Sequence, residues 1–158
     1  MGFALTSMSL TSSAFVSGSQ IPKEHSGEGP DTSPSLNWNE VPEGTKSFAI
    51  VCHDPDAPLL TPEAYGYVHW VLYGIPGSAR DLPENSSDYT QGRNDFGNLG
   101  YGGPMPPPGH GVHQYYFWVF ALNEEIDLPE GLTMLELFKA IEPSVIGMNR
   151  LVGTYERN

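Results

Sequence analysis

Residues 112–122 read VHQYYFWVFAL and form the most hydrophobic run in the chain. Apolar side chains occur at both odd and even positions, as expected for a central strand that is covered on each face of its sheet. The preceding twelve residues, Gly100–Gly111, read GYGGPMPPPGHG, and nine of them are Gly or Pro. No helix or central strand can run through such a segment, because proline lacks an amide donor and glycine loses much backbone freedom on ordering. We therefore predict a preformed loop that shapes a pocket beside a buried strand.

Further strands are predicted on both sides of this run. The clearest is Ser47–His53, which is rich in apolar β-forming residues and is ended by the two prolines of Asp54–Pro58. The other predicted strands are Ala4–Phe15, Leu36–Trp38, Tyr65–Ile75 and Val145–Tyr155. The predicted loops are Gln20–Ser35 on the surface, Gly77–Tyr89, and Arg93–Gly111 with the Gly/Pro segment inside it.

One helix is predicted near the end of the chain. Thr133 and Glu136 have the spacing of a capping box, and Pro143 ends the helix. The apolar residues that repeat on one helix face are Met134, Leu137, Phe138 and Ile141. Because most segments are strands joined by long loops, the pattern favours a β-sandwich with one or two short helices over an α/β fold. We predict a single domain over residues 1–158.

Composition narrows the classes of function. The formal net charge is −12 at pH 7, and the seven Lys and Arg residues are scattered. Nucleic-acid binding and adhesion to anionic membranes both require clustered basic residues, so nucleic-acid binding is excluded and adhesion to anionic membranes is disfavoured. Cys52 is the single cysteine, which excludes an intramolecular disulfide and predicts a small buried hydrophobic residue. No signal peptide or apolar run of membrane-spanning length is recognisable, which predicts a cytoplasmic protein without stable membrane insertion.

Polar side chains lie near the ends of three predicted strands. Asp54 and Asp56 directly follow one strand, where loops gather. His69 lies on the next strand, and His113 and Tyr115 share one face of the strand that follows the Gly/Pro loop. These residue types supply acids, bases and hydroxyl donors to one candidate site.

An ordered set of short motifs extends over nearly the whole chain, from Pro34–Trp38 to Gly153–Tyr155. The motifs are Ser47–Ile50, Asp54–Pro58, His69-Trp70, Gly92–Gly97, Tyr101–Pro104, Pro106-Pro107 and His113-x-Tyr115. In this order they resemble the phosphatidylethanolamine-binding protein family, most closely its bacterial and archaeal Raf-kinase-inhibitor-like branch. Prokaryotic members often carry Cys where this chain has Met105.

The resemblance implies a Greek-key antiparallel β-sandwich with a small anion-binding pocket at one end. Family members bind phosphate, acetate or phosphorylated head groups there, and no cofactor or metal is implied. Some eukaryotic members regulate kinases or other signalling partners, some members inhibit peptidases, and the prokaryotic branch implies a homodimer. The implied ligand-binding residues are Asp54, His69, Gly103, Pro106, Pro107, His113 and Tyr115, supported from behind by Asp56, Trp70, Gly102 and Tyr101.

An acidic protein without an arginine clamp must bind an anion through other donors. Residues 94–138 contain no Lys or Arg. The candidate donors are His69 or His113, the Tyr115 hydroxyl and the backbone N–H groups of the glycine loop, arranged as an anion-binding nest. Asp54 would repel a phosphate, so we expect it to orient a histidine and to favour the protonated form of that histidine. Anion affinity should then rise as the pH falls.

Two enzyme classes are the alternatives. A metal-dependent hydrolase would take its ligands from Asp54, Asp56, His69 and His113, although the chain has no HExxH or similarly spaced histidine cluster. An acyl-transfer hydrolase is disfavoured because there is no Gly-x-Ser-x-Gly elbow and because Cys52 and His53 point to opposite faces of a strand. The leading prediction is a non-enzymatic binding protein with a small anion or phospho-ligand pocket, which modulates a partner protein such as a kinase or a peptidase.

Overall fold

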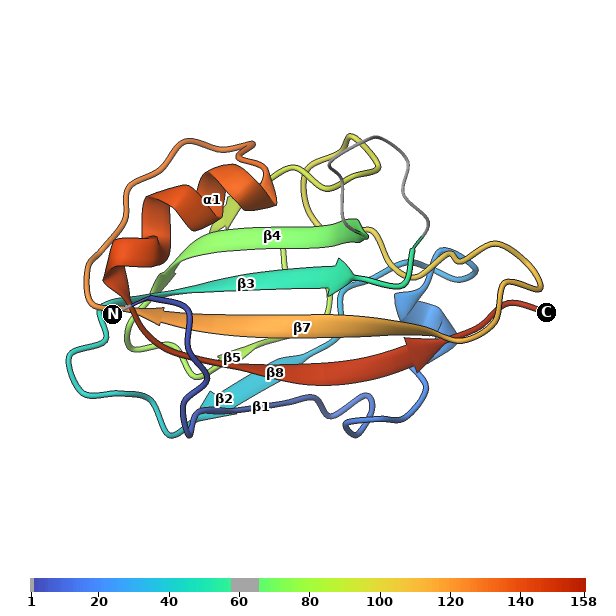
Figure 1. Cartoon of the computed structure of the whole chain (residues 1–158), viewed down its shortest axis with the longest axis horizontal. Helices are drawn as coiled ribbons and strands as arrows, with labels where there is room; N and C mark the ends of the chain where they lie inside the picture. Colours follow the sequence, from blue (N-terminus) through green and yellow to red (C-terminus); the bar gives the residue numbers. More distant parts are fainter. Residues whose placement is uncertain (1, 58–65) are drawn as a thin grey trace.

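A five-stranded antiparallel sheet is the larger part of the fold in the computed structural model, which describes residues 2–57 and 66–158 (Figure 1). The strand order in this sheet is β6-β4-β3-β7-β8. The strands are β3 (Ser47–Asp54), β4 (Tyr67–Pro76), β6 (Thr90–Gln91), β7 (His113–Leu122) and β8 (Val145–Tyr155). The hydrophobic run that begins at residue 112 therefore supplies an interior strand, with β3 on one side and β8 on the other.

A second, three-stranded antiparallel sheet packs against the first. Its order is β1-β2-β5, with β1 (Ser9–Thr11), β2 (Leu36–Asn39) and β5 (Asp81–Leu82). The core between the sheets joins Trp38 of the smaller sheet to Phe48, Ile50 and Phe117 of the larger one, all fully buried. The predicted mainly-β fold with two antiparallel sheets is confirmed.

The helix α1 (Met134–Ile141) covers the opposite face of the larger sheet (Figure 1). Leu137 and Ile141 of the helix share a buried cluster with Val51 of β3 and Phe120 of β7. Alternate residues of β3 thus enter the sandwich core or the layer beneath the helix. This explains why β3 and β7 are apolar at consecutive positions. None of the helices among the described residues has the length and apolarity needed to cross a membrane.

The predicted capping box is present at the start of α1. Thr133 Oγ1 accepts the Glu136 N–H at 3.3 Å, and Glu136 Oε1 accepts the Thr133 N–H at 3.0 Å. We expect Thr133→Ala to lower the free energy of unfolding by about 1 kcal/mol, because an amide of the first turn loses its acceptor. Urea denaturation measures the change, and Thr133→Ser should retain most of the stability. An equal loss in both variants would contradict this role.

The first predicted strand is shorter than expected. Ala4–Phe15 was predicted as a strand, but the strand β1 spans only Ser9–Thr11. Side-chain oxygens of Thr6 and Ser12 accept backbone N–H groups two residues further on. Such local hydrogen bonds compete with strand pairing, and therefore the dense Ser and Thr residues limit the strand.

Two predicted loops contain more structure than their composition indicated. The segment Gln20–Ser35 was predicted to lie on the surface, but it includes a 3-10 helix, η1 (Lys23–His25), and the side chains of Ile21 and His25 are buried. The short strand β5 lies within 77–89, and β6 lies between this loop and Arg93–Gly111, in residues that were assigned to no element. A second 3-10 helix, η2 (Glu142–Ser144), follows α1. Pro58 and Tyr65, at the boundaries of two predicted elements, lie outside the described residues.

Candidate functional site

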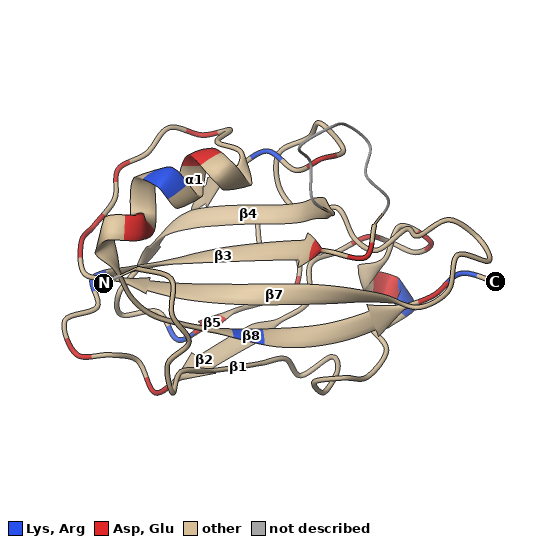
Figure 2. Ribbon diagram, viewed as in Figure 1, with Lys and Arg blue, Asp and Glu red and all other residues tan. Residues whose placement is uncertain are grey.

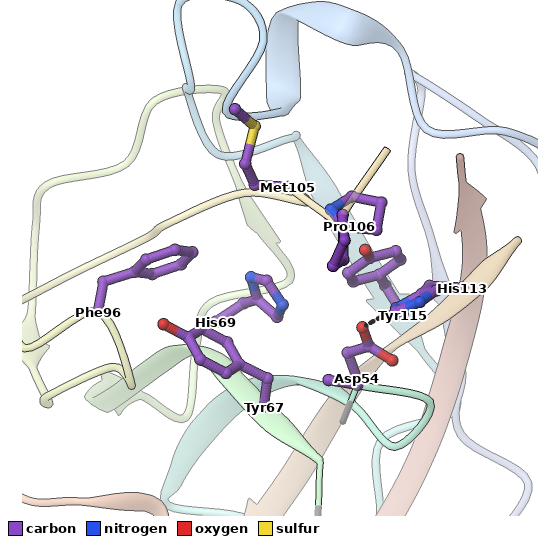
Figure 3. Close-up of a pocket in the computed structure, with 10 residues that line it drawn as sticks. Asp54, Tyr67, His69, Phe96, Met105, Pro106, His113 and Tyr115 are labelled. Carbon is purple, nitrogen blue, oxygen red and sulfur yellow. Dashed lines mark hydrogen bonds and ion pairs between the residues drawn. The ribbon is translucent and has the colours of Figure 1, made fainter. Parts of the chain in front are cut away.

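The candidate site lies at one end of the larger sheet, where three neighbouring strands begin or end. Asp54 is the last residue of β3 and pairs in register with Tyr67, at the start of β4. His113 is the first residue of β7, which is antiparallel to β3 on its other side. Antiparallel pairing brings the end of one strand beside the starts of both neighbours. Side chains from distant parts of the sequence therefore meet at this edge (Figure 3).

A cavity of about 220 Å³ opens between this edge and the Gly/Pro loop. Its lining residues are Asp54, Ala57, Tyr67, His69, Phe96, Met105, Pro106, Pro107, His113 and Tyr115. Six of the seven ligand-binding residues implied by the resemblance are in this set, and Gly103 is not. Sequence reasoning missed Tyr67 and Phe96 as lining residues. The position of Tyr67 two residues before His69 on one strand, and hence on the same face, could have indicated it.

Two short side-chain contacts at one side of the cavity link Asp54 to His113 and His113 to His110. Asp54 Oδ2 lies 2.8 Å from His113 Nδ1, and both side chains are about 2–3% exposed. Asp54 Oδ1 accepts the Asp56 N–H at 2.7 Å, so both carboxylate oxygens are occupied. His113 Nε2 in turn lies 2.6 Å from His110 Nδ1. The exposed side chain of His110, which was not among the predicted site residues, therefore contacts His113.

This arrangement changes what His113 can offer to a ligand. The carboxylate of Asp54 can only accept, so His113 Nδ1 carries a proton. The second ring nitrogen of His113 is engaged by His110. Both nitrogens of His113 therefore have partners within the protein, and a ligand must displace His110 to reach His113 Nε2.

His69 has one ring nitrogen available to the cavity. Its Nδ1 lies 2.7 Å from the Gly102 carbonyl oxygen, and the Gly102 N–H donates to the His69 carbonyl at 2.9 Å. Because a carbonyl only accepts, Nδ1 must carry a proton, and in the neutral ring Nε2 is an acceptor. Burial lowers the pKa of His69 and outweighs the opposing effect of the bond to Gly102. His69 is therefore neutral at pH 7, with its ring directed into the cavity (Figure 3).

Tyr115 contributes a hydroxyl donor to the cavity. Its side chain is 1% exposed, and its ring packs edge-on against His69 with 5.1 Å between the ring centroids. Burial raises the pKa of Tyr115, and the negative charge of Asp54 raises it further. The hydroxyl therefore stays protonated. In the part of the chain that the structure describes, this hydroxyl has no hydrogen-bond partner, which leaves it free to donate to a ligand.

The glycine loop does not form the nest that we expected. The Gly103 N–H donates to Asp31 Oδ1 at 2.7 Å, and the Gly102 N–H is used by His69. The two amides predicted to hold an anion thus have acceptors inside the protein, and Gly103 lies behind the cavity wall. Arg157 donates from Nη1 to the Pro106 carbonyl at 3.2 Å and is not among the lining residues.

The other supporting residues lie behind the cavity. Asp56 Oδ2 accepts the Gln114 N–H at 2.8 Å, which ties the segment after β3 to the start of β7. Trp70 faces the sandwich core, where its ring lies edge-on to Tyr101 with 5.5 Å between centroids. The Tyr101 hydroxyl donates to the His25 carbonyl at 2.5 Å. These three residues hold the walls in place and do not line the cavity.

The geometry gives no support to either hydrolase alternative. Within residues 2–57 and 66–158, the group of His and carboxylate side chains close enough to share a metal ion is Glu24, His25 and Glu84, outside the pocket. Cys52 is fully buried, as predicted, and burial raises the pKa of its thiol well above the ordinary value. A buried thiol that resists ionisation is a poor nucleophile.

Comparisons with known proteins agree with this architecture. The sequence profile described as "Phosphatidylethanolamine-binding protein" matches residues 11–156. The UPF0098 protein of Aquifex aeolicus is 42% identical over 158 aligned residues, which cover 96% of this chain and 90% of that protein. The crystal structure of the homolog CT736 from Chlamydia trachomatis is 36% identical, with a TM-score of 0.88 and coverage of 96% of this chain and 98% of that chain. YbcL of Escherichia coli has a TM-score of 0.87 at 35% identity, over 97% of this chain and 100% of that chain. The chain therefore belongs to the phosphatidylethanolamine-binding protein family.

Proposed function

We propose that this protein is a non-enzymatic binding protein whose cavity takes a small anion, such as phosphate or the phosphate group of a phosphomonoester. The observation that carries the proposal is the pairing of the free Tyr115 hydroxyl with the buried ring of His69 in one small cavity. The volume of about 220 Å³ is below that of pockets for drug-sized ligands, about 300–1,000 Å³, and suits a small ion with a short substituent. The name of the family supports a phosphorylated head group as ligand.

In this proposal, an anion binds in the cavity together with a proton that is taken up by the protein. No Lys or Arg is among the lining residues, and Lys and Arg are spread over separate elements of the fold (Figure 2). The neutral His69 presents an acceptor at Nε2, which repels an anion. Protonation of His69 converts Nε2 into a charged donor beside the Tyr115 hydroxyl, and two such donors can hold one anionic oxygen each. The proposal therefore couples anion binding to proton uptake at His69.

Anion affinity should rise as the pH falls below neutrality. His69 is neutral in the free protein at pH 7 because its pKa is lowered, and a bound anion favours the protonated ring. Linkage then gives up to about a tenfold gain in affinity per pH unit for one proton taken up. The gain levels off once the pH is below the lowered pKa of free His69. Calorimetric titration with sulfate between pH 5.5 and 8 measures it, since sulfate does not change charge in this range.

The matched control for this pH dependence is His69→Asn. The asparagine amide can retain the hydrogen bond to the Gly102 carbonyl but cannot take up a proton. Protein-wide changes in charge affect both proteins equally, so the slope of the variant measures that background. Equal slopes in the wild-type protein and the variant would contradict the proposed mechanism.

Tyr115→Phe tests the second donor. We expect sulfate affinity at pH 6 to fall about tenfold or more, because a hydrogen bond to a charged group is lost, at about 1.5–3 kcal/mol. Tyr116→Phe is the control, since the Tyr116 hydroxyl contacts Gln114 Oε1 at 3.2 Å and does not line the cavity. Similar losses in both variants, measured in the same calorimetric titration, would place the anion elsewhere.

The proposal concerns this cavity alone. Modulation of a kinase or peptidase, formation of a homodimer and a cytoplasmic location stay predictions of the sequence.

A further inference from the structure

A second cluster of titratable side chains lies outside the cavity and plays no part in the proposed function. Glu24 and His25 come from η1, and Glu84 comes from the segment after β5. Their ligand-type atoms lie within 4.8 Å of one another. His25 Nε2 is 3.7 Å from Glu24 Oε1 and 3.8 Å from Glu84 Oε1.

His25 is held in the orientation of a metal ligand. The residue is 1% exposed, and its Nδ1 lies 2.8 Å from the Thr32 carbonyl oxygen. The carbonyl requires the proton on Nδ1, so the lone pair of the neutral ring is on Nε2. That atom faces the two carboxylates beyond hydrogen-bond distance and has no hydrogen bond within the described part of the chain. Metal-binding histidines commonly donate their other ring nitrogen to a backbone carbonyl in this way.

The backbone under the cluster is organised by hydrogen bonds. The Thr32 N–H donates to the Glu24 carbonyl at 3.2 Å, which closes the segment around His25. The Asn85 N–H donates to the Ser33 carbonyl at 2.9 Å, and this bond ties the segment of Glu84 to the same segment. Two chain segments about 60 positions apart are thus joined beside the cluster. Only the two exposed carboxylates must adjust to close around an ion.

We propose that Glu24, His25 and Glu84 bind one divalent transition-metal ion of the zinc type. Zinc takes imidazole nitrogen and carboxylate oxygen at about 2.0–2.2 Å, which in tetrahedral geometry separates neighbouring ligand atoms by about 3.3–3.6 Å. The observed 3.7 and 3.8 Å from His25 Nε2 to the two carboxylates require only a small closure, and the two carboxylates lie within 4.8 Å of each other. An imidazole ligand favours zinc over Ca²⁺ and Mg²⁺, which prefer oxygen. Two carboxylates neutralise the ion, and water completes its coordination.

The metal would stabilise the structure behind the anion cavity. The carbonyl of His25 accepts the Tyr101 hydroxyl, and the Gly27 N–H donates to the Pro104 carbonyl at 2.9 Å. The segment that carries His25 therefore supports the Gly/Pro loop from outside. No residue of the cluster lines the cavity, so the metal has a structural role there and takes no part in binding the anion.

Titration of the metal-free protein with Zn²⁺ alone, at pH 7 and followed by calorimetry, tests the proposal. We expect one ion per chain and a melting temperature that rises with zinc concentration. Glu24→Gln combined with Glu84→Gln should weaken binding at least a hundredfold while the protein stays folded, since both side chains are exposed. Glu43→Gln combined with Glu125→Gln removes the same charge elsewhere on the surface and should leave zinc binding unchanged.

A separate variant tests the buried metal ligand, His25. His25→Asn can keep the hydrogen bond to the Thr32 carbonyl and removes Nε2, so it should also lose zinc binding. Co²⁺ should give the strong visible absorption of a tetrahedral site in the wild-type protein and not in the variant. The proposal is overturned if no stoichiometric zinc binds, or if the Glu24/Glu84 pair of substitutions and the Glu43/Glu125 pair weaken binding equally. Sulfate affinity should be unchanged in the Glu24/Glu84 variant, so the two proposals fail independently.

Discussion

Replacing Asp54 with alanine is expected to lower the free energy of unfolding by about 2–6 kcal/mol, because two N–H donors are left without an acceptor, at about 1–3 kcal/mol for each buried donor. The carboxylate lies 2.8 Å from His113 Nδ1, and both side chains are only about 3% exposed. Without Asp54, the buried Nδ1–H of His113 and the backbone N–H of Asp56 both lose their acceptors. Urea denaturation at pH 7 gives the difference.

Asp56→Ala is the matched control for this experiment. Asp56 is a carboxylate two residues away, and it is exposed and, among the described residues, accepts the Gln114 N–H alone. We expect its removal to cost about 1 kcal/mol, the contribution of one ordinary hydrogen bond. Should the alanine variant of Asp54 not fold, Asp54→Asn applies, because it retains the shape and the acceptor for Asp56. Equal stabilities of the Asp54 and Asp56 variants would contradict the structural role of the Asp54–His113 pair.

Gly103→Ala is expected to lower the free energy of unfolding by about 3 kcal/mol, at the upper end of the range for overpacking. A Cβ at this position would overlap the carbonyl oxygen of His25 and lie 2.6 Å from Asp31 Oδ1. Both obstacles belong to the segment that supports the Gly/Pro loop, and one of them is backbone that cannot rotate away. The loop should therefore move outward and lose the hydrogen bond between the Gly103 N–H and Asp31.

The control lies in the same loop. Gly109 has a φ of +72° and nothing within 4 Å of an added Cβ, so Gly109→Ala introduces backbone strain without a steric overlap. That strain should cost about 1–2 kcal/mol. Thermal unfolding and sulfate titration of both variants separate the two effects. Gly103→Ala should also weaken sulfate binding, and full retention of stability and affinity would show that the loop does not rest on His25.

The strands and the helix were largely predictable because their signals are local. The strand Val145–Tyr155 was predicted with the bounds that the structure has, since its apolar residues follow the proline that ends the helix. Thr133 and Glu136 interact three residues apart, so their spacing alone indicates the cap. The short strands β5 and β6 have two residues each and carry no periodic signal, and therefore they were missed.

The site was predictable only in part. Asp54, His69, His113 and Tyr115 were expected from ordered motifs, and the structure brings all four to one cavity. The prediction of an anion-binding nest at Gly102 and Gly103 was wrong. The acceptors that bind these two N–H groups cannot be recognised from the sequence of the loop itself. Asp31 lies 72 residues before Gly103, and nothing in the sequence of the loop indicates this contact. The contact between Glu84 and His25 is likewise not indicated by the sequence around either residue.

Local sequence patterns were sufficient to predict the two-sheet fold, the start of the helix and the residue types of the cavity. The reason is that alternation, capping and proline–glycine content act over a few residues. Tertiary packing decided which donors stay free. It occupied both nitrogens of His113 and both glycine amides, and it left the Tyr115 hydroxyl and one nitrogen of His69 facing the cavity. A buried donor or acceptor forms its hydrogen bond with the partner that the tertiary structure places beside it. That partner depends on contacts between segments far apart in the sequence.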